Sequence, residues 1–184
     1  MNGREQLTEW LMDDDPTQVL RKSLSELFSL LPELAPCYGF DHKHPHHHLD
    51  VWEHTLLALS RTPARLAVRL AALLHDCGKP VCFTEGEVRH FYGHPEMSAK
   101  LCRRALDRLG FSDRITEYVT RLVRMHDTPV RKAEADQLNF YLDLFDLQYA
   151  DTMAHAPDKL SSRHEYLEGF KALLQKCKPD PVSE

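Results

Sequence analysis

The feature that most constrains this chain is a His-Asp pair at the end of an apolar segment. Residues 71–80 read Ala-Ala-Leu-Leu-His-Asp-Cys-Gly-Lys-Pro, so His75 and Asp76 directly follow a run of apolar side chains. A carboxylate beside an imidazole at the end of a buried helix costs much free energy unless a partner satisfies both groups, and a divalent metal ion is such a partner. The pair therefore favours a fold that brings further metal ligands to this point.

Helical patterns dominate the sequence, and we expect an all-α, single-domain bundle. A chain of 184 residues is long enough to bury one core without disulfides. Apolar periodicity, cap residues and prolines predict helices at about 16–31, 51–61, 63–75, 94–109, 112–126, 133–154 and 157–176. Residues 77–93 contain two glycines and short alternating stretches, which predict a long loop or a small hairpin.

Composition argues against several classes of protein. The net charge of −5 provides no broad positive field, so a nucleic-acid partner stays open but is not favoured. The five cysteines are odd in number and have no C-x-x-C spacing, which argues against disulfides and a cysteine zinc site. No apolar run approaches the length of a membrane span, and residues 1–6 lack the apolar region of a signal peptide. We therefore expect a cytoplasmic protein with no membrane partner; the sequence does not predict its oligomeric state.

The chain is rich in histidine. Five of its 12 histidines crowd one internal segment, at positions 42, 44, 46, 47 and 48. Two interpretations of this tract stay open. It is either a solvated polar loop or the mouth of a site that later residues build.

Other histidines and acids lie where helical spacing turns them inward. Residues at i, i+3, i+4 and i+7 share one helix face. This spacing puts His54, His75, His94, His126 and Asp151 each on an apolar stripe. Any one of them could be a core residue bonded to a carbonyl, but one shared metal cluster would satisfy them all. A ligand set of imidazole and carboxylate without thiolate suits Mn, Fe, Co, Ni or Zn, with Mg as a further candidate.

The pattern H…HD…D, met by His54, His75-Asp76 and Asp151, resembles the HD superfamily of metal-dependent phosphohydrolases. The match is closest to the HD domain of bacterial CCA-adding tRNA nucleotidyltransferases, whose nucleotidyltransferase head is absent here. Four stretches carry that resemblance, namely 49–55, 71–80, 90–94 and 118–126. The resemblance divides the chain into N-terminal helices packing on the core (1–35), the HD domain (36–156) and a C-terminal helix (157–184).

The resemblance also implies roles for single residues. His54, His75, Asp76 and Asp151 would hold one metal ion. His94 and His126 would either hold a second ion with Asp76 as the bridging ligand, or only bind substrate phosphate. Lys79 would neutralise charge on the phosphoryl group, or would merely complement the C-terminus of a helix. Gly78 is expected to let the backbone turn sharply.

These roles predict a phosphohydrolase that cleaves a phosphate ester of a nucleotide or related small molecule with metal-activated water. Asp76 and Lys79 would be its catalytic residues, and Lys79, His94 and His126 its substrate-binding residues. One or two ions would be its cofactors. Two alternatives stay open: a dinucleoside polyphosphate hydrolase, and a non-catalytic, metal-stabilised module that binds RNA or a protein.

Overall fold

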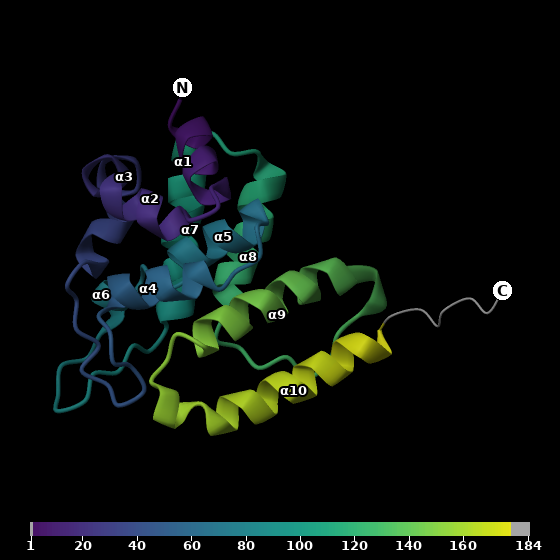
Figure 1. Ribbon diagram of the computed structural model, residues 1–184. Coiled ribbons are helices and arrows are strands. Elements are labelled where there is room, and N and C mark those ends of the chain that lie inside the picture. The colour runs from purple at the N-terminus through teal and green to yellow at the C-terminus, as the bar shows by residue number, and fades with distance from the viewer. Residues whose placement is uncertain (1, 178–184) are drawn as a thin grey trace.

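Ten α-helices and no regular β-strand make up residues 2–177, which are the part of the chain that the computed structural model describes (Figure 1). The prediction of an all-α fold is confirmed. The helices are α1 (Gly3–Met12), α2 (Pro16–Lys22), α3 (Leu24–Leu30), α4 (Val51–Ser60), α5 (Leu66–Leu74), α6 (Lys79–Cys82), α7 (His94–Leu109), α8 (Asp113–Met125), α9 (Leu138–Thr152) and α10 (Ser161–Lys176). Short 3₁₀ turns lie at η1 (Pro32–Cys37), η2 (Ala135–Gln137) and η3 (Pro157–Lys159).

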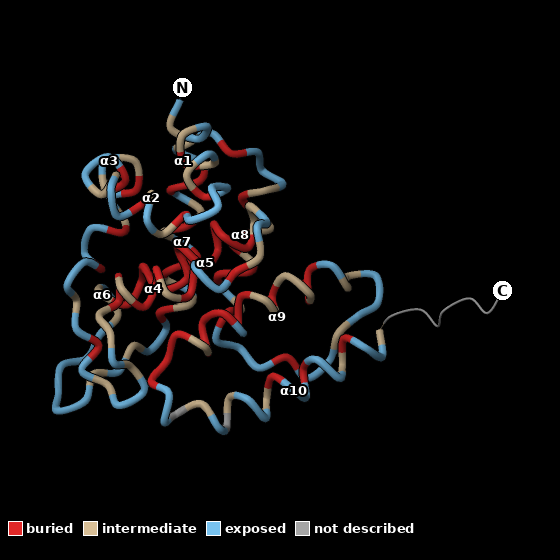
Figure 2. The backbone as a smooth tube through the Cα atoms, in the orientation of Figure 1, coloured by how far each residue is buried: buried red, intermediate tan, exposed pale blue. Residues whose placement is uncertain are grey.

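Helix α5 lies at the centre of the fold and packs against α4, α8 and α9 (Figure 2). Its sequence is apolar all round apart from one arginine, and every residue from Val68 to Leu74 is buried. A helix that is hydrophobic on all faces is stable only inside a protein. The exception, Arg69, donates from Nη1 to the carbonyls of Leu11 (2.5 Å) and Asp13 (2.9 Å) at the end of α1. This contact joins the N-terminal helices to the core.

Local signals explain where three of the helices begin or end. The Asp50 side chain accepts the Glu53 N–H (2.8 Å) and caps the start of α4. Ser112 caps the start of α8 in the same way. Gly110 ends α7 with φ +76°, a conformation that favours glycine. These three boundaries agree with the sequence patterns.

Other boundaries differ from the predictions. The helix expected over 16–31 is interrupted at Ser23 (φ −105°, ψ 26°), which separates α2 from α3. Residues 62–65 form a turn in which the Arg65 N–H donates to the Pro63 carbonyl (2.7 Å), so α5 begins only at Leu66.

The two long helices at the C-terminal end also depart from expectation in detail. The helix expected over 133–154 begins at Leu138, after the turn of η2. Helix α10, expected from 157, begins only at Ser161, after the turn of η3. It runs back along α9 and exposes its outer face to solvent (Figures 1 and 2). Residues 178–184, the end of the expected C-terminal segment, lie outside the described residues.

The segment 77–93 contains the short helix α6 and a single antiparallel bridge between Thr84 and His90 rather than a regular hairpin. It lies beside the histidine-rich loop, because the Arg89 N–H donates to the Lys43 carbonyl (3.0 Å). Figure 1 shows these two loops together at one edge of the bundle.

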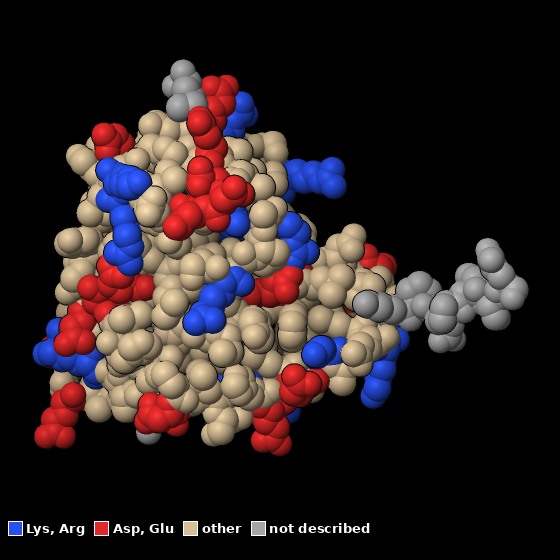
Figure 3. Space-filling view, in the orientation of Figure 1, with Lys and Arg blue, Asp and Glu red and all other residues tan. Residues whose placement is uncertain are grey.

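Figure 3 shows charges of both signs on one face of the molecule, with acidic side chains gathered over α1 and no broad basic field. No helix within residues 2–177 is long and apolar enough to cross a membrane.

Candidate metal centre

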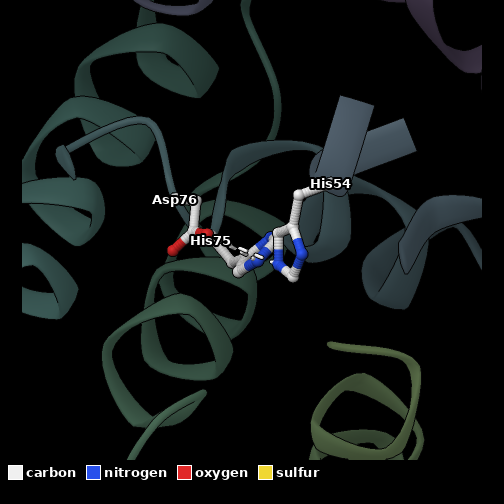
Figure 4. Close-up of side chains that lie close together, drawn as sticks. All are labelled: His54, His75 and Asp76. Atoms are coloured by element: carbon white, nitrogen blue, oxygen red, sulfur yellow. Dashed lines mark ion pairs between the residues drawn. The ribbon is translucent and has the colours of Figure 1, made fainter. Parts of the chain in front are cut away.

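The structure brings all six predicted ligand residues to one place, although they come from five segments. His54 lies within α4, His75 and Asp76 directly follow α5, and Asp151 lies in the last turn of α9. His94 begins α7, and His126 directly follows α8. All six side chains are buried. Figure 4 shows His54, His75 and Asp76 pointing toward one another.

Asp76 is the centre of this cluster because each of its carboxylate oxygens faces a different pair of imidazoles. Its Oδ2 lies 3.3 Å from His75 Nε2 and 3.6 Å from His54 Nε2. Its Oδ1 lies 3.3 Å from His94 Nε2 and 3.6 Å from His126 Nε2. One carboxylate is thus shared between two neighbouring groups of ligands.

Asp151 closes the first of these groups. Its Oδ1 lies 2.9 Å from His54 Nε2 and 3.6 Å from His75 Nε2. Burial alone would raise the pKa of Asp151, but His155 and His54 beside it outweigh burial and hold its pKa well below the usual range. The carboxylate is therefore ionised and available as a ligand.

The four imidazoles share one arrangement: each Nδ1 faces a backbone carbonyl. The carbonyl acceptors belong to Ala154 for His54 (3.2 Å), Ala72 for His75 (2.8 Å), Phe91 for His94 (2.9 Å) and Val123 for His126 (2.7 Å). A carbonyl can only accept, so each Nδ1 carries a hydrogen and the neutral ring has its lone pair on Nε2. Metal-binding histidines are held in this way in proteins, by a hydrogen bond from the ring nitrogen that does not bind the metal.

The pKa values of the residues at the centre show that its two buried carboxylates attract positive charge. Burial opposes a charged His75, but Asp76 and Asp151 outweigh burial and raise the pKa of His75 to about 10. Burial would likewise raise the pKa of Asp76, yet His75 and Lys79 hold that pKa well below its ordinary value. By contrast, burial lowers the pKa of His126. Two ionised carboxylates are buried here, and cations stabilise them.

The donor atoms fit a divalent metal ion. Within the described residues, His75 Nε2 and both Asp76 carboxylate oxygens have no hydrogen bond of regular geometry. Of these atoms, Asp76 Oδ2 lies 2.7 Å from the Lys79 ammonium, and leaving the other two buried atoms without a partner is costly. Three ligand groups have donor atoms within 4.8 Å of one another: His54–His75–Asp76, Asp76–His94–His126 and His54–Asp151–His155. Mixed imidazole and carboxylate donors suit divalent transition metals.

Lys79 points into this centre from the first residue of α6 and is buried. Its Nζ lies 2.7 Å from Asp76 Oδ2 and 3.1 Å from His42 Nε2. The four residues of α6 form a single turn, so Lys79 also lies in the last turn of that helix, and both roles expected for it stay predictions.

Gly78 lies in the turn between α5 and α6, as expected, but its right-handed helical angles (φ −81°, ψ −17°) are open to any residue, so the turn itself does not require a glycine. A Cβ at this position would lie 2.6 Å from the backbone nitrogen of Ser98 in α7. The glycine is required by this close approach between α6 and α7.

Two residues near the centre, His155 and Arg163, were not identified from the sequence. His155 donates from Nδ1 to the Asp151 carbonyl (2.8 Å), and burial lowers its pKa to about 4. Its i, i+4 spacing from Asp151 was a usable signal. The second, Arg163 of α10, lies 3.4 Å from Asp151 Oδ2 and belongs to a helix whose docking no local pattern predicts.

Each interpretation of the histidine-rich tract holds for some of its members. His46 and His48 are exposed. His42 and His47 stack on each other, with ring centroids 3.7 Å apart, and His47 lines the pocket over the cluster. His42 donates from Nδ1 to the Leu49 carbonyl (2.8 Å), so its Nε2 can accept a hydrogen bond from Lys79.

A pocket of about 320 Å³ opens over the cluster, and we call it the metal pocket. Asp76, His94, His126 and Asp151 line its floor. The other lining residues include three cationic side chains, those of Lys79, Arg89 and Arg163. Ligand atoms for a cation and basic groups for an anion thus meet in one cavity.

Comparison with known proteins matches these features to a family. The model of the HD domain family matches residues 46–156. A CC-adding tRNA nucleotidyltransferase of Thermus thermophilus is 36% identical over 164 residues, which cover 84% of this chain and 38% of that protein. An A-adding tRNA nucleotidyltransferase of Deinococcus radiodurans is 30% identical over 179 residues, covering 88% of this chain and 41% of the relative. A multifunctional CCA protein of an Azoarcus species is 35% identical over 114 residues, covering 57% of this chain and 27% of the relative.

The chain therefore spans less than half the length of these relatives. The similarity confirms the predicted resemblance to the HD domain of tRNA nucleotidyltransferases. HD domains bind divalent metals and characterise a superfamily of metal-dependent phosphohydrolases. The family match spans more than half of the chain, and this protein belongs to the HD domain family.

Proposed function

We propose that this protein is a metal-dependent phosphohydrolase that cleaves a phosphate ester of a nucleotide or a related small molecule. One observation carries the proposal. Four imidazole Nε2 atoms, each with its Nδ1 held by a backbone carbonyl, converge on two buried carboxylates in a pocket that basic side chains also line. Structural metal sites have no need of a cavity with basic groups, whereas hydrolysis of a phosphate ester does.

In this proposal, His54, His75, Asp76 and Asp151 hold one ion, and Asp76 with His94 and His126 holds a second. The distances from the two Asp76 oxygens to the two histidine pairs support its role as the shared ligand. When bound, such ions supply Lewis acidity, which polarises a phosphoryl oxygen and makes water a stronger nucleophile at neutral pH.

The protein itself supplies orientation and charge. Lys79 faces the pocket and would neutralise charge that develops on the phosphoryl oxygens. The Nε2 lone pair of His42, 3.1 Å from Lys79 Nζ, helps to orient the Lys79 ammonium. In the reaction, the oxygen of water bonds to phosphorus, the ester P–O bond breaks, and the alcohol leaves with a proton. His94 and His126 would contact the substrate phosphate if only one ion binds.

The test is a metal-dependent assay. Purified protein receives Mn, Fe, Co, Ni, Zn or Mg in turn, and release of phosphate or alcohol is measured from phosphomonoesters, phosphodiesters and nucleotides. We expect turnover with at least one transition metal and its loss in Asp76→Asn. Asp136→Asn, which changes an exposed carboxyl in η2, is the matched control. If none of these metals supports turnover, or if Asp76→Asn retains full turnover, the proposal is contradicted. Analysis of the products formed from dinucleoside polyphosphates tests the alternative that the protein is a hydrolase of those compounds.

A second candidate function is RNA binding without catalysis, which the names of the tRNA-directed relatives favour. The net charge of −5 and the lack of a broad basic field on the face in Figure 3 weigh against it. An electrophoretic shift with tRNA at low and at high salt tests it. A shift at physiological salt without hydrolysis of any ester would favour this candidate.

A further inference from the structure

A second cavity adjoins the metal pocket. It has a volume of about 230 Å³, and we call it the side pocket. His126, Asp127 and Arg163 line both cavities, so the two share a boundary. The remaining wall comes from the loop after α8 and from the facing sides of α9 and α10. The HD family match ends at residue 156, so the family does not define the part of this pocket formed by α10.

Away from the boundary with the metal pocket, the side pocket is lined by rings and by small or polar side chains. Pro129, Thr128 and Tyr166 are among its lining residues. The Tyr166 hydroxyl is already engaged, because it accepts the Val130 N–H (3.0 Å) and donates to Gln148 Oε1 (2.6 Å).

Gln148 is engaged as well, since its Nε2 donates to the carbonyls of Met125 and Thr128, each at 2.9 Å. These bonds hold Gln148 and the Tyr166 hydroxyl in place, and the Tyr166 residue is part of the pocket wall. A pocket of this kind suits an uncharged, flat group.

The charges at the shared boundary have opposite signs. The Arg163 guanidinium lies between two carboxylates, with Nη1 3.4 Å from Asp151 Oδ2 and Nη2 3.4 Å from Asp127 Oδ1. Both distances are long for charged hydrogen bonds, so the guanidinium has donors to spare for a phosphate in the metal pocket. Asp127 disfavours a second phosphate in the side pocket and accepts N–H or O–H groups instead.

We propose that the side pocket binds the nucleoside part of a nucleoside monophosphate whose phosphate lies in the metal pocket, with Arg163 at the junction. This inference rests on the proposed function and narrows its substrate class. The Tyr166 ring provides the face on which a base stacks, and such stacking is sequence-tolerant. Asp127 provides the acceptor for a base or ribose hydrogen.

The test compares two phosphate esters that differ only by the base. Adenosine 5′-monophosphate has a base, whereas ribose 5-phosphate has none. Thr128 is exposed on the rim of the side pocket, so Thr128→Trp fills the pocket and Thr128→Ser is the matched control. We expect Thr128→Trp to lower kcat/KM about tenfold more for the nucleotide than for ribose 5-phosphate, because only the nucleotide loses a base-stacking contact of that scale. Thr128→Leu, a smaller filler, repeats the comparison if the tryptophan variant does not fold.

A binding measurement distinguishes failure of this inference from failure of the proposed function. Adenosine is titrated calorimetrically into the wild-type protein and the filled variant. Adenosine binding that the filled variant loses, without hydrolysis of any ester, would support the side pocket and contradict only the phosphohydrolase. Hydrolysis in which the filled variant treats both esters as the wild type does would overturn the side pocket alone. Failure of the wild-type protein to bind adenosine would also overturn the side pocket.

Discussion

The close approach at Gly78 leads to a quantitative prediction for Gly78→Ala. The added Cβ would lie 2.6 Å from Ser98 N, 2.8 Å from the His94 carbonyl oxygen and 2.8 Å from Ser98 Oγ. Two of these three atoms belong to the backbone of α7, so relief requires that α6 and α7 separate. Overpacking of this kind costs about 1–3 kcal/mol.

Separation would also weaken the bond from the Gly78 N–H to Ser98 Oγ (2.9 Å), which contributes about 0.5–1.5 kcal/mol. The sum is about 1.5–4.5 kcal/mol. For a chain of this length it corresponds to a fall in Tm of roughly 3–18 °C. Metal-dependent turnover should fall as well, because α6 begins with Lys79 and α7 begins with His94.

Circular dichroism melts of the metal-free protein measure this effect. Gly169→Ala is the matched control, because a Cβ there meets no atom within 4 Å. In the helix interior of α10 this control should raise stability by up to about 1 kcal/mol, since alanine has the higher helix propensity. A Gly78→Ala protein with the Tm and turnover of the wild type would refute the reasoning.

Three further predictions concern the metal, Lys79 and a surface ion pair. Mn²⁺ at one hundred times its Kd should stabilise the fold by about 2.7 kcal/mol, which raises Tm by roughly 5–11 °C; an unchanged Tm with every transition metal contradicts the centre. Lys79→Met should lower kcat by about 10²–10³-fold while metal content by mass spectrometry stays constant; wild-type kcat would restrict Lys79 to packing. Burial would raise the pKa of Glu33, but hydrogen bonds from Arg108 outweigh burial and hold that pKa below its unfolded value of about 4.5. The pair therefore stabilises the fold above the unfolded pKa, and this stability is lost as the pH falls through the folded pKa. Urea melts across this range should show that Glu33→Gln destabilises near neutral pH and has little effect in acid; an equal loss at every pH would indicate packing alone.

Local sequence signals predicted the fold well where a single residue decides the boundary. Asp50, Ser112 and Gly110 each satisfy or terminate backbone groups of their own helix, so no distant contact is needed. The signals failed where tertiary contacts compete. Arg65, expected inside a helix, instead pairs with Asp143 and Asp146 on α9 from the turn that precedes α5. Helix α1 is absent from the helices predicted above, although its capping box at Asn2 and Glu5 is a local signal.

The candidate site was predictable in part for the same reason. His54 and Asp151 lie on helices whose apolar stripes dictate which side faces inward, and His75, His94 and His126 lie at helix ends. Their roles as ligands stay predictions. His42 lies on a loop, where no periodicity predicts which side chains turn inward, and its Nε2 lies 3.1 Å from Lys79 Nζ.

The hydrogen bonds that orient the imidazoles end on main-chain atoms, and this has a consequence for how the protein can evolve. The carbonyl at each of positions 72, 91, 123 and 154 is present whichever amino acid occupies that position. Side chains there can vary with the needs of packing while the ring tautomers persist. In proteins that orient such rings with an aspartate side chain, one substitution removes the acceptor. In this protein the acceptors are backbone carbonyls, which no amino-acid substitution removes.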